Sequence, residues 1–171
     1  MNDDGFLEQV QRAFQRELAE GSLRLTSHTY RPEAFGNATA VLEAPELRLM
    51  ISKDRSLYYA YVAHPKSPLR WTFLQMAIPA AAGRSKPDYY HPHGNELDIA
   101  SAAELFRSHR ETLAAAYKKN GWAFSRRLKK ISREYQDRMI EWHASPEGKK
   151  AYADILARIE AVRAGVPPEK R

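Results

Sequence analysis

The sequence lacks cysteine altogether, which excludes disulfide bonds, thiolate metal sites and cysteine nucleophiles. Glycine is scarce as well: the eight glycines are scattered, so a glycine-rich loop that cradles phosphate groups is not expected. The chain also contains no G-x-S-x-G, H-E-x-x-H, Walker-type or dinucleotide-binding motif. Because no nucleophile can be paired with a base, we expect a protein without enzymatic activity and without a cofactor.

Long hydrophobic runs are missing too. The longest weakly polar run, around Met76 to Gly83, is far too short to span a bilayer. The N-terminus, M-N-D-D-G-F-L-E, is acidic and has no basic flank followed by an apolar core, so no secretory signal peptide is expected. Hydrophobic residues at 43% and charged residues at 28% are ordinary for a globular domain. We therefore expect a cytoplasmic protein that does not bind a membrane.

The excess of basic charge is confined to one segment. The chain carries 27 Lys and Arg against 21 Asp and Glu, a formal net charge of +6. Residues 117–138 hold eight of these basic side chains and two of the acidic ones, so this segment accounts for the whole excess. The parts before and after it are close to neutral. A positively charged surface is therefore expected on a single helix and not over the whole domain.

The periodicity of apolar residues predicts an α+β fold. Near the N-terminus they recur every four positions and indicate a helix over residues 4–20: Phe6, Val10, Phe14 and Leu18. Short alternating segments separated by polar turns then indicate an antiparallel meander of three to four strands, because parallel strands would need long crossovers. The expected strands are residues 22–30, 37–43, 47–53 and 57–63.

The segment after the meander is predicted to lead into helices. Residues 69–78 are expected to form a short helix that ends at Pro79, and residues 80–97 to form a long loop. In Ser101-Ala-Ala-Glu104 the serine and the glutamate are spaced as in a capping box, which indicates the start of a helix.

Two further helices complete the expected fold. One runs from about Trp122 to Trp142, and the last begins at Ser145-Pro146-Glu147, with serine as the cap and proline in the first turn. The expected organisation is a single domain over residues 1–171 with three parts: a helix plus meander (1–79), the long loop (80–97) and a bundle of about three helices (98–171).

The stretch D88-Y-Y-H-P-H-G-N-E-L-D98 in the long loop has the residues best suited to chemistry. Proline favours an extended backbone at His91, and a His-x-His pair in an extended segment can project both rings to one side. Asp88, Glu96 and Asp98 could add oxygen ligands for metal-assisted hydrolysis. No third ligand stands at a defined spacing, however, so no metal is expected. We favour a loop that contacts a partner through four side chains: Tyr89, Tyr90, His91 and His93.

The predicted strand 57–63 is rich in tyrosine. Its alternation places Tyr59 and Tyr61 on one face of the sheet and Tyr58 on the other. If helices cover only one side of the sheet, one of these faces is exposed. Exposed tyrosines suit recognition because they offer a large contact area and lose little rotamer entropy. Packing at the sheet edge is the alternative, and we count Tyr58, Tyr59 and Tyr61 among the candidate partner-binding residues.

The predicted helix 122–142 separates apolar from basic residues. At about 100° per residue, its apolar residues cluster within one arc. Four basic residues fall on the opposite face: Arg126, Lys129, Lys130 and Arg133. Such a face can contact nucleic-acid phosphates, dock an acidic protein or only be solvated. We prefer a protein partner, because no nucleic-acid motif is present and the aromatic residues of this helix are expected on its apolar side.

Two stretches carry a family resemblance. The run F35-G-N-A-T-A-V-L-E-A-P-E-L-R-L-M-I-S-K-D-R55 combines Phe-Gly-Asn-Ala, Leu-Arg-Leu and Asp-Arg, and A103-E-L-F-R-S-H-R-E-T-L-A114 precedes the basic helix. In these features the chain resembles small bacterial proteins of the immunity or antitoxin-like kind, over most of residues 35–140. The resemblance implies a toxin as partner and carries over no catalytic residue. The Ala80–Leu97 loop and the last helix depart from it.

The sequence thus predicts a non-enzymatic protein-binding module, in its narrower form an immunity-like protein that neutralises a bacterial toxin by direct binding. Nucleic-acid binding through the basic helix is the alternative. Metal-dependent hydrolysis at His91 and His93 is the least favoured interpretation.

Overall fold

The computed structural model describes residues 4–34, 36–55, 57–67, 70–87, 96–119 and 121–163. The chain forms two compact units, Met1–Ser132 and Arg133–Arg171, whose boundary falls within one long helix. That the chain is one domain stays a prediction.

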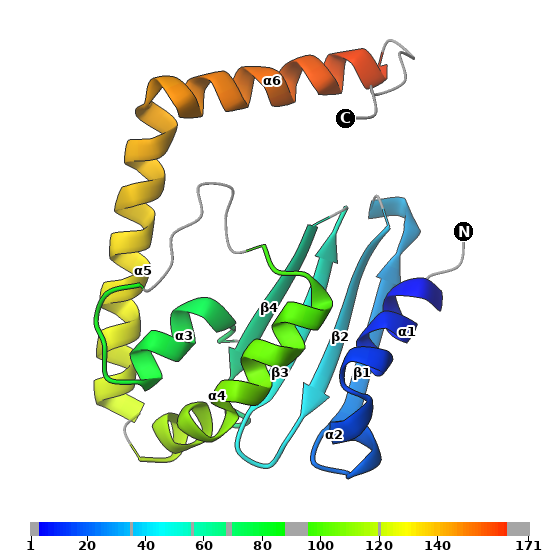
Figure 1. Ribbon diagram of the computed structural model, residues 1–171, viewed down its shortest axis with the longest axis vertical. Helices are drawn as coiled ribbons and strands as arrows, with labels where there is room; N and C mark the ends of the chain where they lie inside the picture. The colour runs from blue at the N-terminus through cyan, green and yellow to red at the C-terminus, as the bar shows by residue number, and fades with distance from the viewer. Residues whose placement is uncertain are drawn as a thin grey trace. The chain divides into compact units, whose positions relative to one another are not determined.

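The fold is α+β, as predicted: short N-terminal helices, an antiparallel sheet and three long C-terminal helices (Figure 1). The helices are α1 (Asp4–Ala13), α2 (Gln15–Ala19), the 3-10 turn η1 (Pro32–Ala34), α3 (Leu74–Ala81), α4 (Ile99–Lys119), α5 (Gly121–Ala144) and α6 (Pro146–Arg163). The strands are β1 (Arg24–Arg31), β2 (Asn37–Glu43), β3 (Arg48–Asp54), β4 (Leu57–Ala63) and β5 (Thr72–Phe73).

The sheet is a meander in the order β1-β2-β3-β4-β5, with every neighbouring pair antiparallel. The predicted topology is confirmed, but the sheet has five strands and not three to four. The additional strand, β5, consists of two residues that pair with Tyr61 and Val62 of β4. So short a strand carries no alternation of its own, and only the pairing with β4 defines it.

Helices α1, α3 and α4 lie on one side of the sheet (Figure 1). Alternate residues of the central strands point toward these helices and are buried, which follows from the two-residue period of a strand. They include Ala40, Leu42, Leu49, Ile51, Ala60 and Val62. On the helix side, Phe14 meets Phe106 of α4 edge to face, with ring centroids 6.2 Å apart. The core of the first unit therefore lies between the sheet and this layer of helices.

Two predicted helices have different bounds in the structure. The N-terminal helix is interrupted at Phe14, so that α1 and α2 replace one helix over residues 4–20. The helix expected over residues 69–78 begins only at Leu74 and continues through Pro79 to Ala81. The amides after the proline still find acceptors, because Ala82 N donates to the Ile78 carbonyl oxygen at 2.9 Å. Proline therefore does not end the helix there.

The capping box predicted at Ser101 is wrong. Helix α4 starts at Ile99, and Asp98 supplies the cap: its Oδ1 accepts the Ser101 amide at 2.9 Å and its Oδ2 accepts the Ser101 hydroxyl at 2.5 Å. These hydrogen bonds lower the pKa of Asp98, because they favour the ionised carboxylate. The residue that caps α4 therefore lies three positions before the serine.

The predicted cap of the last helix is confirmed. Ser145 Oγ accepts a hydrogen bond from the Gly148 amide at 3.1 Å, and Pro146 occupies the first turn of α6. Glycine is required at residue 148, since a Cβ atom there would lie 2.0 Å from the carbonyl oxygen of Trp142. Tyr152 of α6 is 58% exposed.

A buried carboxylate joins the N-terminal helices to α4. Glu17 of α2 is 6% exposed, and its Oε1 accepts a hydrogen bond from Arg107 Nε at 2.5 Å. Arg107 also donates to Glu17 Oε2 and to the Ala13 carbonyl oxygen, both at 3.2 Å. The hydrogen bond from Arg107 lowers the pKa of Glu17 and outweighs the opposing effect of burial. The pair fixes α1 and α2 against α4.

No helix within the described ranges is both long enough and apolar enough to cross a membrane.

Candidate protein-binding surface

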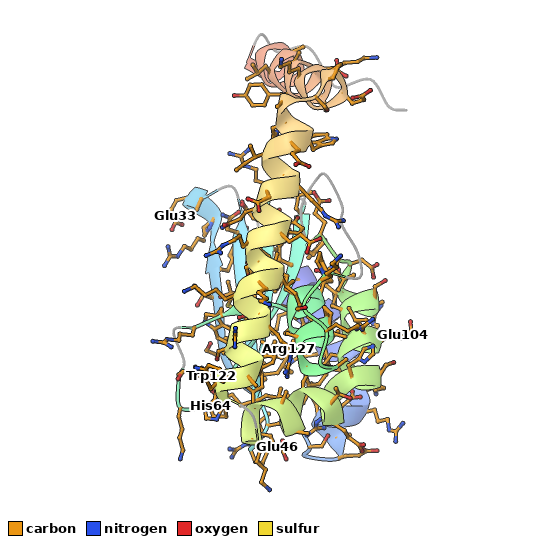
Figure 2. All side chains as sticks on the ribbon, turned by 90° about the vertical axis from the view of Figure 1, so that its left-hand side faces the viewer. Glu33, Glu46, His64, Glu104, Trp122 and Arg127 are labelled. Carbon is orange, nitrogen blue, oxygen red and sulfur yellow. The ribbon has the colours of Figure 1, made fainter. Side chains whose placement is uncertain are left out.

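The sheet has a second face, opposite α1, α3 and α4, which we call the open face. Alternation along the central strands assigns six residues to it: Thr39, Val41, Met50, Ser52, Tyr59 and Tyr61. The strand register aligns them in rows across the sheet, Thr39 with Ser52 and Tyr59, and Val41 with Met50 and Tyr61. In Figure 2, helices α3 and α4 lie on one side of the strands. Most open-face side chains are half-buried, unlike their fully buried neighbours in sequence.

Three aromatic rings form a cluster on the open face. Tyr61 pairs with Phe73 of β5, and their ring centroids are 4.6 Å apart. Tyr59 lies 6.4 Å from Tyr61 and 6.2 Å from Phe73. All three side chains are half-buried. The cluster therefore offers aromatic area to a partner while its members support one another.

The two tyrosines of this cluster stay protonated at neutral pH. Burial raises the pKa of Tyr59, and the nearby carboxylates of Glu96 and Asp54 add to the effect. Burial also raises the pKa of Tyr61, assisted by Tyr59 and Asp54. Both phenol groups are thus available as neutral hydrogen-bond donors and acceptors.

A hollow of about 380 Å³ adjoins the cluster at one end of the open face. Its lining includes the two tyrosines and the polar side chains of Arg31, Asn37 and Asp54. Asn37 is held in place because its Oδ1 accepts the Arg55 amide at 2.9 Å, in the turn between β3 and β4. The hollow combines donors, acceptors and both signs of charge, which is suited to receiving a projecting polar side chain.

The opposite end of the same face is bounded by charged side chains. Arg48 Nε lies 2.5 Å from Glu43 Oε1, and the two residues are paired across β2 and β3. The Arg48 guanidinium also lies 5.3 Å from the centroid of the Trp71 ring. The open face therefore has an aromatic centre with polar and charged side chains at both ends.

The structure separates the three tyrosines predicted to bind a partner. Tyr59 and Tyr61 lie on the open face, whereas Tyr58 lies on the helix side, where its ring stacks on Phe6 of α1 with centroids 6.4 Å apart. The prediction that they occupy opposite faces is confirmed. Phe73 was not predicted as a surface residue, because it was assigned to a helix; only the pairing of β5 with β4 reveals its place.

The predicted basic residues are all exposed. Arg126, Lys129 and Lys130 belong to the first unit, and Arg133 is the first residue of the second. Arg127, between them in sequence, instead donates from Nε to the Ala80 carbonyl oxygen at 2.7 Å and so anchors α5 on α3 (Figure 2). The expectation that the aromatic residues of α5 avoid the basic side is wrong for Trp122, which is 76% exposed.

The loop residues Tyr89, Tyr90, His91 and His93 lie outside the described residues, so their predicted contact with a partner stays a prediction. Within the described ranges, no three His, Cys, Asp or Glu side chains are grouped so that they could hold a metal ion.

Comparisons with family models, with curated proteins and with solved structures found no match for this chain. The resemblance to immunity and antitoxin-like proteins therefore rests on the quoted residues alone.

Proposed function

We propose that the protein is a binding module whose protein partner docks on the open face of the sheet. The observation that carries the proposal is the cluster of Tyr59, Tyr61 and Phe73, which is half-buried on the side of the sheet opposite α1, α3 and α4. A side chain needed only for the core would be expected on the helix side. Aromatic residues at the centre of a surface are the usual anchors of protein interfaces.

The surroundings of the cluster support this assignment. Interfaces typically have an apolar or aromatic centre and a polar rim. Here the rim consists of Arg31, Asn37 and Asp54 at one end and Glu43 and Arg48 at the other. Because the rim carries both signs of charge, it favours a partner with a mixed polar surface over a strongly acidic one.

The open face can supply about half of the area that each partner buries in a standard interface. Five strands spaced about 4.8 Å apart span roughly 19 Å, and seven residues extend about 23 Å along each long strand. The resulting face of roughly 400 Å² is about half of the 800 Å² that a standard interface buries on each partner. Neighbouring turns would have to supply the rest.

The narrower form of the proposal names the partner as a bacterial toxin that this protein neutralises. Support for it comes from the Phe-Gly-Asn-Ala, Leu-Arg-Leu and Asp-Arg resemblance within residues 35–55. In this form the protein is an immunity-like protein, and binding would act by covering a surface that the toxin needs.

Site-specific crosslinking tests the general proposal. A photo-crosslinking amino acid at Thr39 would lie in the middle of the open face, whereas the same group at Ser108 of α4 is exposed elsewhere. In cells of the source organism we expect a discrete crosslinked protein from residue 39 and none from residue 108. Equal products at both positions, or none at residue 39, would contradict the proposal.

Co-expression then tests the narrower form. If the crosslinked partner is a toxin, its expression alone should stop growth, and co-expression of this protein should restore it. A partner that is harmless when expressed alone would contradict the toxin assignment but not the proposed binding surface.

A further inference from the structure

The first turns of α5 present an exposed tryptophan that the core does not use. Trp122 is 76% exposed and is labelled at the start of α5 in Figure 2. The core contacts of this part of the helix are made by other residues, since Phe124 is 3% exposed and Ile131 is fully buried. Nothing in the packing of the first unit therefore requires a large aromatic residue at position 122.

Trp122 is surrounded by positive charge. The Arg126 guanidinium lies 5.5 Å from the centroid of the Trp122 ring. At about 100° per residue, Arg126, Lys129 and Lys130 fall within roughly 80° of Trp122 around the helix axis. All three are exposed, and none forms an ion pair with another described residue. We call Trp122, Arg126, Lys129 and Lys130 the basic face.

No acidic side chain offsets this charge within the helix segment. Between Glu111 and Glu134 the sequence contains neither Asp nor Glu. Like charges held this close repel one another, at a cost in stability that an anionic ligand would relieve. The charge of the basic face therefore fits a polyanion.

The exposed Trp122 ring indicates which class of polyanion fits the basic face. An acidic protein would need the cations alone, whereas a nucleic acid also has bases that can stack on an indole ring. Insertion into an anionic membrane would need a free apolar side of the helix, but that side of α5 is occupied by the core, as the burial of Phe124 and Ile131 shows. Stacking on a surface ring also needs a base that is not already stacked in a duplex.

We propose that the basic face binds single-stranded nucleic acid. In this arrangement one base stacks on Trp122, while Arg126, Lys129 and Lys130 contact the phosphates on either side of it. This surface differs from the open face, so binding of nucleic acid does not depend on the proposed protein-binding function.

Titration with an oligothymidylate, followed by tryptophan fluorescence, tests the proposal. Stacking should quench Trp122. With about three phosphate contacts, the affinity should fall roughly eighteen-fold between 50 and 200 mM salt. The Trp122→Ala variant should lose the quenching and bind roughly 5- to 150-fold more weakly, while Trp122→Phe should keep most of the affinity.

Charge reversal at two lysines of the basic face is compared with the same change at two control lysines. Lys129→Glu with Lys130→Glu should abolish binding. Lys149→Glu with Lys150→Glu makes the same change in net charge at two adjacent exposed lysines of α6 and should leave binding intact. Circular dichroism of each variant checks that the fold is retained, which is expected because all four lysines are exposed.

Three results would overturn the proposal: unchanged affinity in Trp122→Ala, equal losses in the two lysine pairs, or equally tight binding of poly-glutamate of the same charge. The last result would assign the basic face to an acidic protein. Tyr61→Ala should bind the oligonucleotide normally, so a failure of this proposal is distinguishable from a failure of the proposed protein-binding function.

Discussion

The two faces of the sheet are built from the same strands but differ in their packing. On the helix side, Leu49 and Ile51 of β3 are at most 1% exposed beneath the helices. One residue away, Met50 and Ser52 lie on the open face and are half-buried. Because side chains alternate along a strand, one seven-residue segment can contribute to a core and to a recognition surface at once. Burial, and not hydrophobicity alone, therefore separates the core residues from the candidate binding residues.

Substitutions at two neighbouring residues of β3 should differ most in their effect on stability. Leu49→Ala removes a fully buried side chain and should lower the free energy of unfolding by about 2–5 kcal/mol. Met50→Ala, on the open face, should cost about 1 kcal/mol, since its side chain is only half-buried. Urea denaturation of the two variants measures both values. Equal losses would mean that the open face is packed as a second core.

A smaller effect is expected from the ion pair that holds the helix layer together. Glu17→Gln should lower the free energy of unfolding by about 1–3 kcal/mol at neutral pH, because Arg107 loses its buried partner. The folded pKa of Glu17 lies below its usual value near 4.5. The wild-type protein should therefore keep this stabilisation above pH 4.5 and lose it as the pH falls through the folded pKa.

The control for this pH dependence is Glu20→Gln. Glu20 is exposed and pairs with Arg16 at 3.0 Å, so its loss should change stability by no more than about 0.5 kcal/mol. Denaturation curves measured between pH 3 and pH 7 give the free energy of unfolding at each pH. Its decrease toward acid pH should be smaller than in the wild-type protein for Glu17→Gln only. A smaller decrease in both variants would assign the acid sensitivity to general charge and not to the buried pair.

The cap of α4 should have a smaller effect on stability than the Glu17–Arg107 pair, and it tests how the covering helix begins. Asp98→Ala should cost about 1 kcal/mol, because two hydrogen bonds to Ser101 are lost. Ser101→Ala should cost less, since the Asp98 carboxylate would still accept the amide of residue 101. Thermal unfolding of the two variants compares them. A larger loss for Ser101→Ala would restore the capping box that the sequence suggested.

The long strands were predictable because local signals agreed. For β2 and β4 the alternating pattern and the flanking turns predicted the observed bounds, Asn37–Glu43 and Leu57–Ala63. Strand β5 was not predictable, because two residues carry no period and Trp71, Leu74 and Ile78 are spaced like one side of a helix. The start of α4 was ambiguous for a related reason: Asp98 and Ser101 are both good caps, and only the hydrogen bonds decide between them.

The candidate surfaces were predictable only in part. Alternation correctly placed Tyr59 and Tyr61 opposite Tyr58, but which face the helices cover depends on tertiary packing. The exposed Trp122 could have been found from sequence, because at 100° per residue it falls among Arg126, Lys129 and Lys130. The burial of Glu17 could not have been found from sequence, since it depends on Arg107, ninety residues away.

The affinity of the purified protein for its crosslinked partner decides whether the open face is the binding surface. Tyr61→Ala removes the central ring of the open face, and Tyr152→Ala removes the same atoms from an exposed site in α6. Isothermal titration should show Tyr61→Ala weakening binding by at least about 2 kcal/mol, roughly thirty-fold, with Tyr152→Ala unchanged. Unaltered affinity in Tyr61→Ala, with the fold intact, would contradict the assignment of the open face as the binding surface.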